Sequence, residues 1–142
     1  MKCRVVFDTS SLVSASLRPS SIPDRALTLA LKSCQLCSCA DSLAQREEVL
    51  QRPRFDAYVG RDTRLAFYVT IRTHSQIFAL TGAVLNQVEG QCRDGTDDFI
   101  LALALATQAE VIVTSDKDLL VLHPWHGIAI LKPAQFLAQA VI

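Results

Sequence analysis

Hydrophobic and polar positions form two alternating kinds of segment along the chain. Short runs of apolar, often β-branched residues end in polar residues, as is typical of fully buried strands. Longer segments carry apolar residues at helical spacing and begin near Asp, Ser or Pro, as is typical of helices. The pattern predicts strands at 3–7, 36–38, 111–114 and 128–131, helices at 23–31, 42–50, 62–79, 97–108 and 133–140, and a short helix or turn at 116–120.

The order of these segments predicts the fold class. Strands that alternate with helices indicate a parallel sheet covered on both faces. The helix at 97–108 is apolar on every side, so we expect it to lie at the centre. The serine-rich segment after the first strand is expected to begin as a turn at 9–11. The expected fold is α/β, a three-layer α/β/α sandwich with a central, mostly parallel sheet, and residues 1–142 are expected to form one domain.

The composition is that of a chain that forms a hydrophobic core. Of the 142 residues, 50% are hydrophobic and 20% are charged, which excludes a disordered or fibrous protein. The longest uncharged apolar stretch, 99–109, has only about half the length that a membrane span requires. The apolar run at 5–7 is too short for the central region of a signal peptide. We therefore expect a cytoplasmic protein that does not span a membrane.

Cysteines and charges narrow the range of partners. The 5 cysteines lack the paired spacing of a zinc site or a disulfide framework, so we expect them to be small buried hydrophobic residues. The 14 basic and 14 acidic residues give no net charge, which argues against binding nucleic acid through bulk charge. The charges are unevenly distributed, however, because segment 46–72 is rich in arginine and segment 93–118 in acids. The first segment can lie near phosphate, and the second can hold a cation.

Three aspartates are expected at one edge of the sheet. Asp8 directly follows the first strand, and Asp116 lies two residues beyond the strand at 111–114. The helix before that strand runs antiparallel to it, so its first turn, with Asp98, reaches the same edge, where ligands of parallel sheets bind. Like charges this close repel unless a cation neutralises them. A site with only oxygen ligands favours Mg²⁺ or Mn²⁺ over zinc or copper.

Each acid also has a simpler structural interpretation. Asp98 is favoured at a helix N-terminus by the helix dipole, and Asp116 can cap the turn after its strand. Asp8 is harder to explain in this way, because a serine would cap the following turn equally well. A shared cation site accounts for all three acids together, and we favour it over three separate caps.

At these residues the chain resembles the PIN-domain family, in particular the toxin-like branch near the VapC-type ribonucleases. The opening Val-Val-Phe-Asp8-Thr-Ser is similar to the first family motif. The stretch Asp98-Phe-Ile-Leu-Ala-Leu-Ala, followed by Thr114-Ser-Asp116, is similar to the third and fourth motifs in order and spacing. The resemblance implies hydrolysis of RNA phosphodiester bonds, with Asp8, Asp98 and Asp116 as the catalytic residues that hold Mg²⁺ or Mn²⁺. It also implies the toxin of a toxin–antitoxin pair, a small antitoxin partner and a homodimer.

One position departs from the family pattern. Where the family has a glutamate on the helix after the second strand, this chain has Gln45, whose amide oxygen can coordinate a metal but brings no charge. Glu48, one helical turn further, is a candidate replacement ligand. Its position four residues before Arg52 also favours an exposed ion pair. The alternative function is therefore a catalytically weak PIN-like module that binds RNA or a partner protein.

Other residues are candidates for supporting roles. The hydroxyls of Ser10 and Thr114 are suited to hydrogen-bond the carboxylates or a nearby water. Asp118 is a weaker ligand candidate, because its neighbours favour a surface turn equally well. Candidates for contact with the RNA backbone, although such charges commonly lie on solvated helix faces, are Arg52, Arg54, Arg61 and Arg64.

Overall fold

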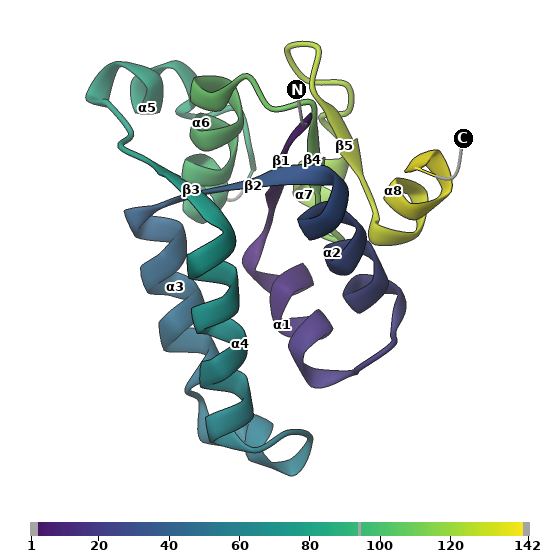
Figure 1. The fold of residues 1–142 in the computed structure, drawn as a ribbon. Coiled ribbons are helices and arrows are strands. Elements are labelled where there is room, and N and C mark those ends of the chain that lie inside the picture. Colours follow the sequence, from purple (N-terminus) through teal and green to yellow (C-terminus); the bar gives the residue numbers. More distant parts are fainter. Residues whose placement is uncertain (1–2, 94, 141–142) are drawn as a thin grey trace.

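The central sheet has five strands, all of them parallel. The computed structural model describes residues 3–93 and 95–140. The strands lie in the order β3-β2-β1-β4-β5, so the chain builds the sheet outward from β1 on one side and then crosses to the other side (Figure 1). The strands are β1 (Cys3–Phe7), β2 (Cys34–Cys39), β3 (Ser75–Phe78), β4 (Val111–Val113) and β5 (Ala129–Leu131).

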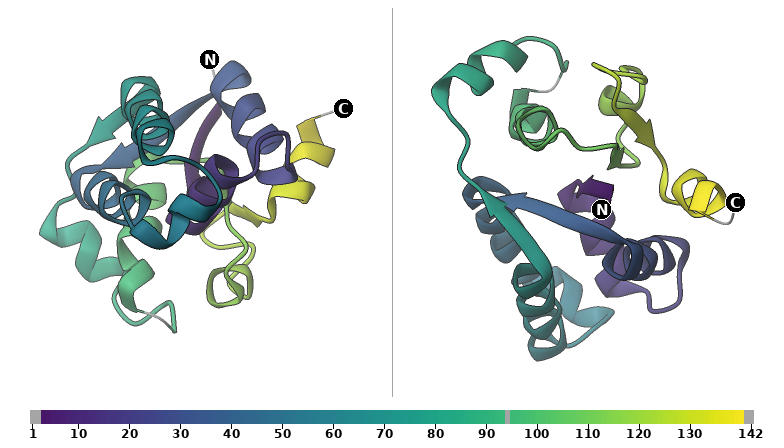
Figure 2. Two further views of the ribbon diagram at one scale, coloured as in Figure 1. Left: turned by 90° about the horizontal axis from the view of Figure 1, so that it is seen from below. Right: turned by 45° about the horizontal axis from the view of Figure 1, so that its top comes forward.

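Helices cover both faces of this sheet. On one face lie α1, α2, α3, α4 and α8, and on the other lie α5, α6 and α7 (Figures 1 and 2). The predicted three-layer α/β/α sandwich with a parallel central sheet is confirmed. The helices are α1 (Thr9–Leu17), α2 (Ile22–Ser33), α3 (Ala40–Leu50), α4 (Arg61–His74), α5 (Gly82–Val88), α6 (Asp98–Thr107), α7 (Lys117–Leu120) and α8 (Pro133–Ala140), with 3₁₀ turns η1 (Pro53–Ala57) and η2 (Gly95–Asp97).

The central strands are buried on both faces, which explains their uninterrupted apolar sequence. In β1, Val5 and Phe7 pack against α1 and α2, whereas Val6 packs against α6. The paired strand β4 repeats this alternation, with Ile112 opposite Val6 and on the same face. Neither strand has a side that faces water, so neither shows alternating polar positions.

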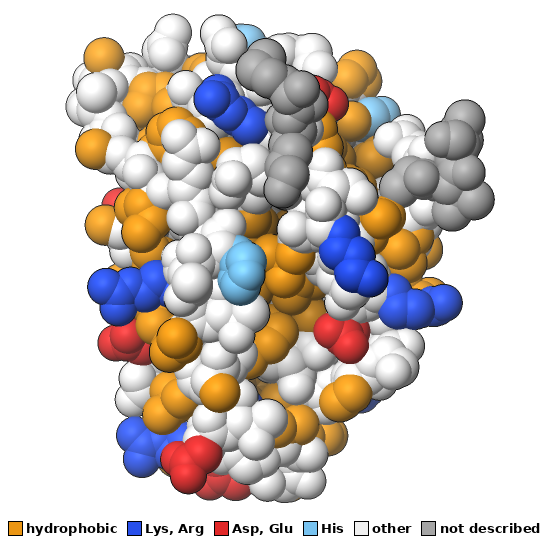
Figure 3. Space-filling model, viewed as in Figure 1, with side chains coloured by type: hydrophobic (Ala, Val, Ile, Leu, Met, Phe, Trp, Pro, Cys, Tyr) orange, Lys and Arg blue, Asp and Glu red, His pale blue; other side chains and the backbone are white. Residues whose placement is uncertain are grey.

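Helix α6 occupies the centre of its layer, as its sequence predicts. Residues 100–104 are all fully buried, so a helix without a polar face is satisfied here by packing on every side. Among the described residues, no helix combines the length and the apolar character needed to cross a membrane. On the face of the molecule seen in Figure 3, charged side chains of both signs are scattered among uncharged ones.

The expected turn at 9–11 is instead the first turn of α1. Serines are weak helix formers because their hydroxyls compete for backbone hydrogen bonds. Here the Asp8 carboxylate caps the helix by accepting the Ser11 N–H at 2.9 Å, and Leu12 and Ala15 are buried against the sheet. Capping and burial together outweigh the low intrinsic propensity of this segment.

The predicted helix at 62–79 is too long at its C-terminal end. It ends at His74, and the next four residues form the edge strand β3. The reason is pairing with β2, supported by a hydrogen bond of 2.8 Å between the hydroxyls of Ser38 and Ser75. Helix α5 follows in a segment for which the pattern predicts no element.

Two of the five cysteines correct the expectation that all are buried hydrophobic residues. Cys3 and Cys34 are opposite each other in the register of β1 and β2, with Cα atoms 4.7 Å apart, and form a disulfide. Cys37, Cys39 and Cys92 are buried, as predicted.

A buried arginine joins α4 to the end of α3. The Arg64 side chain has no exposed surface, and its Nε donates to the carbonyl oxygen of Leu50 at 2.7 Å. Its Nη atoms donate to the carbonyl oxygens of Val59 and Arg52 and form an ion pair with Asp56 at 2.8 Å. One guanidinium thus satisfies the backbone on both sides of η1, which has no buried residue of its own.

Replacing this arginine is expected to destabilise the fold. Arg64→Met should lower the free energy of unfolding by about 3 kcal/mol, because buried carbonyl groups lose their hydrogen-bond donors. Arg61→Met, on the same helix but exposed, is the matched control and should change stability by less than about 0.5 kcal/mol. Urea denaturation of the three proteins measures both values. A loss for Arg64→Met no larger than that of the control would contradict this anchoring role.

Candidate active site

A cavity lies beyond the carboxyl ends of β1 and β4, where the strand order reverses. In open parallel sheets this is the position at which ligands bind. The cavity has a volume of about 480 Å³ and is walled by α1, α3, η1 and the start of α6. Its polar lining comprises Asp8, Thr9, Ser10, Ser14, Gln45, Arg52, Arg54, Asp97 and Asp116. We call this space the acidic cavity.

Asp8 is held at the base of the acidic cavity by both of its carboxylate oxygens. Oδ1 caps α1 through the Ser11 N–H. Oδ2 accepts the Ser10 hydroxyl at 3.1 Å and the Thr114 hydroxyl. Asp8 does cap α1, a role that a serine could also fill, but a serine could not make this cap and accept both hydroxyls at once. Only 5% of Asp8 is exposed, so its position is tightly defined.

Thr114 connects Asp8 to Asp116. Its buried hydroxyl donates to Asp8 and accepts the backbone N–H of Asp116 at 2.9 Å. Asp116 in turn caps α7 by accepting the N–H of Asp118 at 2.9 Å. The carboxylates after β1 and β4 are thus linked through one hydroxyl, whereas Asp118 supports Asp116 through its backbone and does not line the acidic cavity.

The third acid that lines the acidic cavity is Asp97, not Asp98. Asp97 ends η2 and directly precedes α6, whereas Asp98 is the first residue of that helix. The Asp98 Oδ1 atom is buried without a hydrogen-bond partner, and its Oδ2 lies 4.0 Å from where a Cβ on Gly95 would be. The expectation that Asp98 faces the other two acids is therefore not met. Two adjacent acids look alike in the sequence, and the 3₁₀ turn before the helix decides which one enters the cavity.

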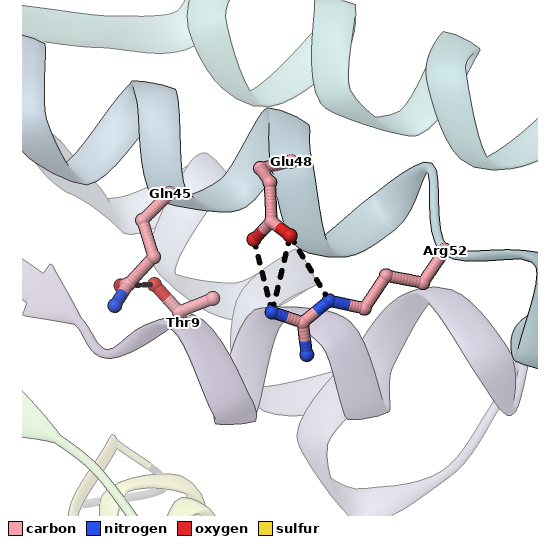
Figure 4. Close-up of polar contacts among 4 residues, drawn as sticks. All are labelled: Thr9, Gln45, Glu48 and Arg52. Carbon is pink, nitrogen blue, oxygen red and sulfur yellow. Dashed lines mark hydrogen bonds and ion pairs between the residues drawn. The ribbon is translucent and has the colours of Figure 1, made fainter.

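Gln45 lines the acidic cavity from α3. Its Oε1 accepts the hydroxyl of Thr9, so the amide ties α3 to the first residue of α1 (Figure 4). Glu48 lies one turn further and forms an ion pair of 3.0 Å with Arg52 (Figure 4). The Glu48 side chain is 64% exposed and is not part of the cavity lining. Of the two interpretations of Glu48, the geometry favours the exposed ion pair.

The side chain of Arg46 is a buried cation near Asp8. The sequence pattern did not predict its burial. Arg46 is fully buried, and its two Nη atoms donate to the Phe7 carbonyl and the Ser38 hydroxyl, each at 2.8 Å. Burial lowers the pKa of Arg46 to about 10, while the nearby Cys39 and Asp8 act in the opposite direction. The spacing of position 46 from the buried leucines 43 and 50 of α3 is the signal that could have revealed it.

The four arginines predicted to contact RNA differ in position. Arg52 and Arg54 line the acidic cavity, and Arg61 is exposed at the start of α4 outside it. Arg64 is fully buried and its donors are used within the protein. The prediction that Arg64 contacts the RNA backbone is therefore wrong.

The donors at the acidic cavity are carboxylate, amide and hydroxyl oxygens. This donor set fits a hard divalent cation such as Mg²⁺ or Mn²⁺ and not a softer metal. Within residues 3–93 and 95–140, however, no three His, Cys, Asp or Glu side chains form a group close enough to hold an ion. The donor chemistry of the cavity lining fits a hard divalent cation.

Known proteins share this fold over almost the whole chain. The structure of PAE2754 from Pyrobaculum aerophilum superposes with a TM-score of 0.68 at 14% identity, covering 100% of both chains. VapBC2 from Rickettsia felis, bound to a DNA fragment from its promoter, has a TM-score of 0.64 at 12% identity, over 89% of this chain and 96% of the other. Mycobacterium tuberculosis VapC20, a Sarcin-Ricin loop cleaving toxin, has a TM-score of 0.60 at 12% identity, over 88% and 98% of the two chains.

Sequence comparison identifies the family. An uncharacterized protein of Methanocaldococcus jannaschii is 26% identical over 124 residues, which span 87% of this chain and 77% of the relative. The family pattern of the PIN domain matches residues 4–118, which include Asp8, Gln45, Asp97, Asp98 and Asp116. The chain therefore belongs to the PIN-domain family.

Proposed function

We propose that this protein is a metal-dependent ribonuclease that hydrolyses RNA phosphodiester bonds. The observation that carries the proposal is that Asp8, Asp97 and Asp116, from three separate parts of the chain, line one cavity at the point where the strand order reverses. PIN nucleases generally use divalent metal ions. The oxygen donors of the acidic cavity are suited to Mg²⁺ or Mn²⁺.

The roles follow from the contacts of each side chain. Asp8, Asp97 and Asp116 would hold the ion, with Gln45 as a neutral oxygen donor. When bound, the divalent ion would activate a water for attack on phosphorus and offset the charge that develops on the phosphate. Ser10 and Thr114 orient the Asp8 carboxylate through their hydroxyls, as Asp118 orients Asp116 through its backbone.

Arg52 and Arg54 are placed to bind the RNA backbone. Both line the acidic cavity, where guanidinium groups would pair with phosphate oxygens next to the scissile bond. Arg61 lies outside the cavity and would contact more distant phosphates.

The proposed biological context is the toxin of a toxin–antitoxin pair. Among the proteins of similar fold, VapC20 is a toxin that cleaves the Sarcin-Ricin loop, and VapBC2 is bound to a DNA fragment from its promoter. An RNA substrate and a small antitoxin partner follow from this similarity, as does the expectation of a homodimer in the cytoplasm.

A catalytically weak PIN module that binds RNA or a partner protein is the second candidate. It is favoured by Gln45, which removes one negative charge from the acidic cavity where the family pattern has a glutamate. Because fewer charged ligands lower the affinity for metal, Gln45 is expected to reduce the rate of RNA cleavage and not the stability of the fold.

Substitutions of two adjacent aspartates, Asp97 and Asp98, test metal binding. Millimolar Mn²⁺ is expected to raise the melting temperature of the wild type, since binding to the native state alone stabilises it by about 2.7 kcal/mol at a hundredfold excess over Kd. Asp97→Asn should lose most of this shift, and Asp98→Asn, the matched control, should keep it. Thermal denaturation with Mn²⁺ and with EDTA measures the shift of each variant against its own metal-free state. Equal shifts in the wild type and Asp97→Asn would exclude Asp97 as a ligand.

Restoring the missing carboxylate tests the position of Gln45. Gln45→Glu is expected to tighten Mn²⁺ binding by about tenfold and to raise the initial rate of RNA cleavage, because a charged ligand replaces a neutral one. Glu48→Gln should leave Mn²⁺ affinity unchanged, because Glu48 pairs with Arg52 outside the acidic cavity. Mn²⁺ titration and cleavage of a labelled RNA give both quantities, with Asp8→Asn as the inactive reference. If Glu48→Gln weakens metal binding and Gln45→Glu does not strengthen it, the roles of these two residues must be exchanged.

A further inference from the structure

Arg46 brings a buried positive charge to the backbone beside Asp8. One Nη atom donates to the carbonyl oxygen of Phe7, the residue immediately before Asp8, at 2.8 Å. The other donates to the hydroxyl of Ser38 in β2, also at 2.8 Å. The guanidinium therefore lies between the ends of β1 and β2, while the adjacent Gln45 lines the acidic cavity itself.

These two hydrogen bonds do not compensate the cost of burying Arg46. Only 1% of the residue is exposed, and its Nε has no hydrogen-bond partner. It lines a small space together with apolar side chains, among them Leu12, Leu50 and Ile71. A charge in such surroundings is unfavourable unless an opposite charge lies nearby. The buried Arg64, by comparison, has its ion pair with Asp56.

Asp8 supplies an opposite charge. Burial lowers the pKa of Arg46 to about 10, and Cys39 and Asp8 act against this shift, so the guanidinium stays positive at neutral pH. Because both Arg46 and Asp8 are buried, water and salt screen their attraction only weakly.

The arginines that line the acidic cavity are less suited to this role. Arg54 is exposed to solvent. The Arg52 side chain is 42% exposed and forms an ion pair with Glu48. Solvent screening weakens their effect on Asp8 relative to that of Arg46.

We propose that Arg46 is a built-in counter-ion of Asp8, which balances the acidic cavity without metal and lowers its affinity for a divalent cation. A cation bound at Asp8 is repelled by the guanidinium, and the neutral Gln45 adds no charge to offset this repulsion. Positions 45 and 46 thus act in the same direction on the cavity. The effect on metal affinity rests on the proposed metal site, whereas the pairing with Asp8 does not.

A double-mutant cycle in EDTA tests the pairing. Arg46→Met is expected to lower the melting temperature, partly because it leaves the Asp8 charge uncompensated. Asp8→Asn removes that charge and keeps an oxygen that can cap α1. In the Asp8→Asn background, Arg46→Met should therefore cost about half of the melting temperature that it costs in the wild type. If Arg46→Met alone does not fold, recovery of folding in the double variant supports the pairing, and no recovery overturns it.

The matched control is the same substitution at the other buried arginine. Arg64→Met also removes a buried guanidinium, but its acid is Asp56, so its loss and that of Asp8→Asn should add. Additive losses for Arg46→Met and Asp8→Asn would overturn the pairing. Equal departures from additivity in both cycles would overturn it as well, because the effect would then not be specific to Arg46.

Mn²⁺ titration by calorimetry tests the effect on metal affinity. Arg46→Met should bind Mn²⁺ about tenfold more tightly than the wild type, and Arg64→Met should bind it like the wild type. Equal affinity of Arg46→Met and the wild type would refute the effect on metal binding.

Cleavage of a labelled RNA in Mn²⁺ separates this proposal from the ribonuclease proposal. If no RNA is cleaved but the losses of Arg46→Met and Asp8→Asn are not additive in EDTA, the nuclease activity is refuted and the counter-ion stands. If RNA is cleaved and the losses are additive, only the counter-ion is refuted.

Discussion

The carboxylate of Asp8 joins the sheet, the first helix and the candidate active site. One oxygen caps α1, and the other accepts the hydroxyls of Ser10 and Thr114. Because Thr114 also accepts the N–H of Asp116, the ends of β1 and β4 and the start of α1 belong to one hydrogen-bonded unit. Charged acceptors make strong hydrogen bonds in buried surroundings. The acid that is proposed to bind metal is therefore also the residue that determines where the first helix begins.

Helix α3 is held by polar contacts from its middle and at its C-terminal end as well as by apolar packing. The buried Arg46 connects it to the end of β1, and the buried Arg64 connects its last residue, Leu50, to α4. The Arg64 guanidinium is satisfied by three backbone carbonyl oxygens and Asp56, which compensates the cost of burying its charge, whereas Arg46 donates to one carbonyl and one hydroxyl and its Nε has no hydrogen-bond partner. Gln45 therefore lies on a firmly positioned helix. With an amide in place of a carboxylate at this position, the acidic cavity carries one negative charge fewer. The backbone of residue 45 is held in place by the contacts of neighbouring residues of α3.

Much of the architecture was determined by the sequence alone. Buried parallel strands require unbroken apolar runs, so β1, β4 and β5 and the central helix α6 could be identified from hydrophobicity. Asp8 and Asp116 could be placed at one edge because each lies within three residues of the end of such a strand, and all strands of a parallel sheet end at the same edge. The resemblance to PIN domains rested on the same positions.

Only the tertiary structure decided the features that depend on side-chain direction or on distant partners. Asp97 and Asp98 differ by one position, and the turn η2 determines which of them lines the acidic cavity. Arg64 was indistinguishable from an exposed arginine until Leu50 and Asp56 were seen around it. Likewise, β3 exists because β2 offers an unpaired edge to residues whose own pattern continues a helix. The local spacing of apolar residues indicates which side chains are buried. The orientation and pairing of polar groups depend on atoms from distant parts of the chain.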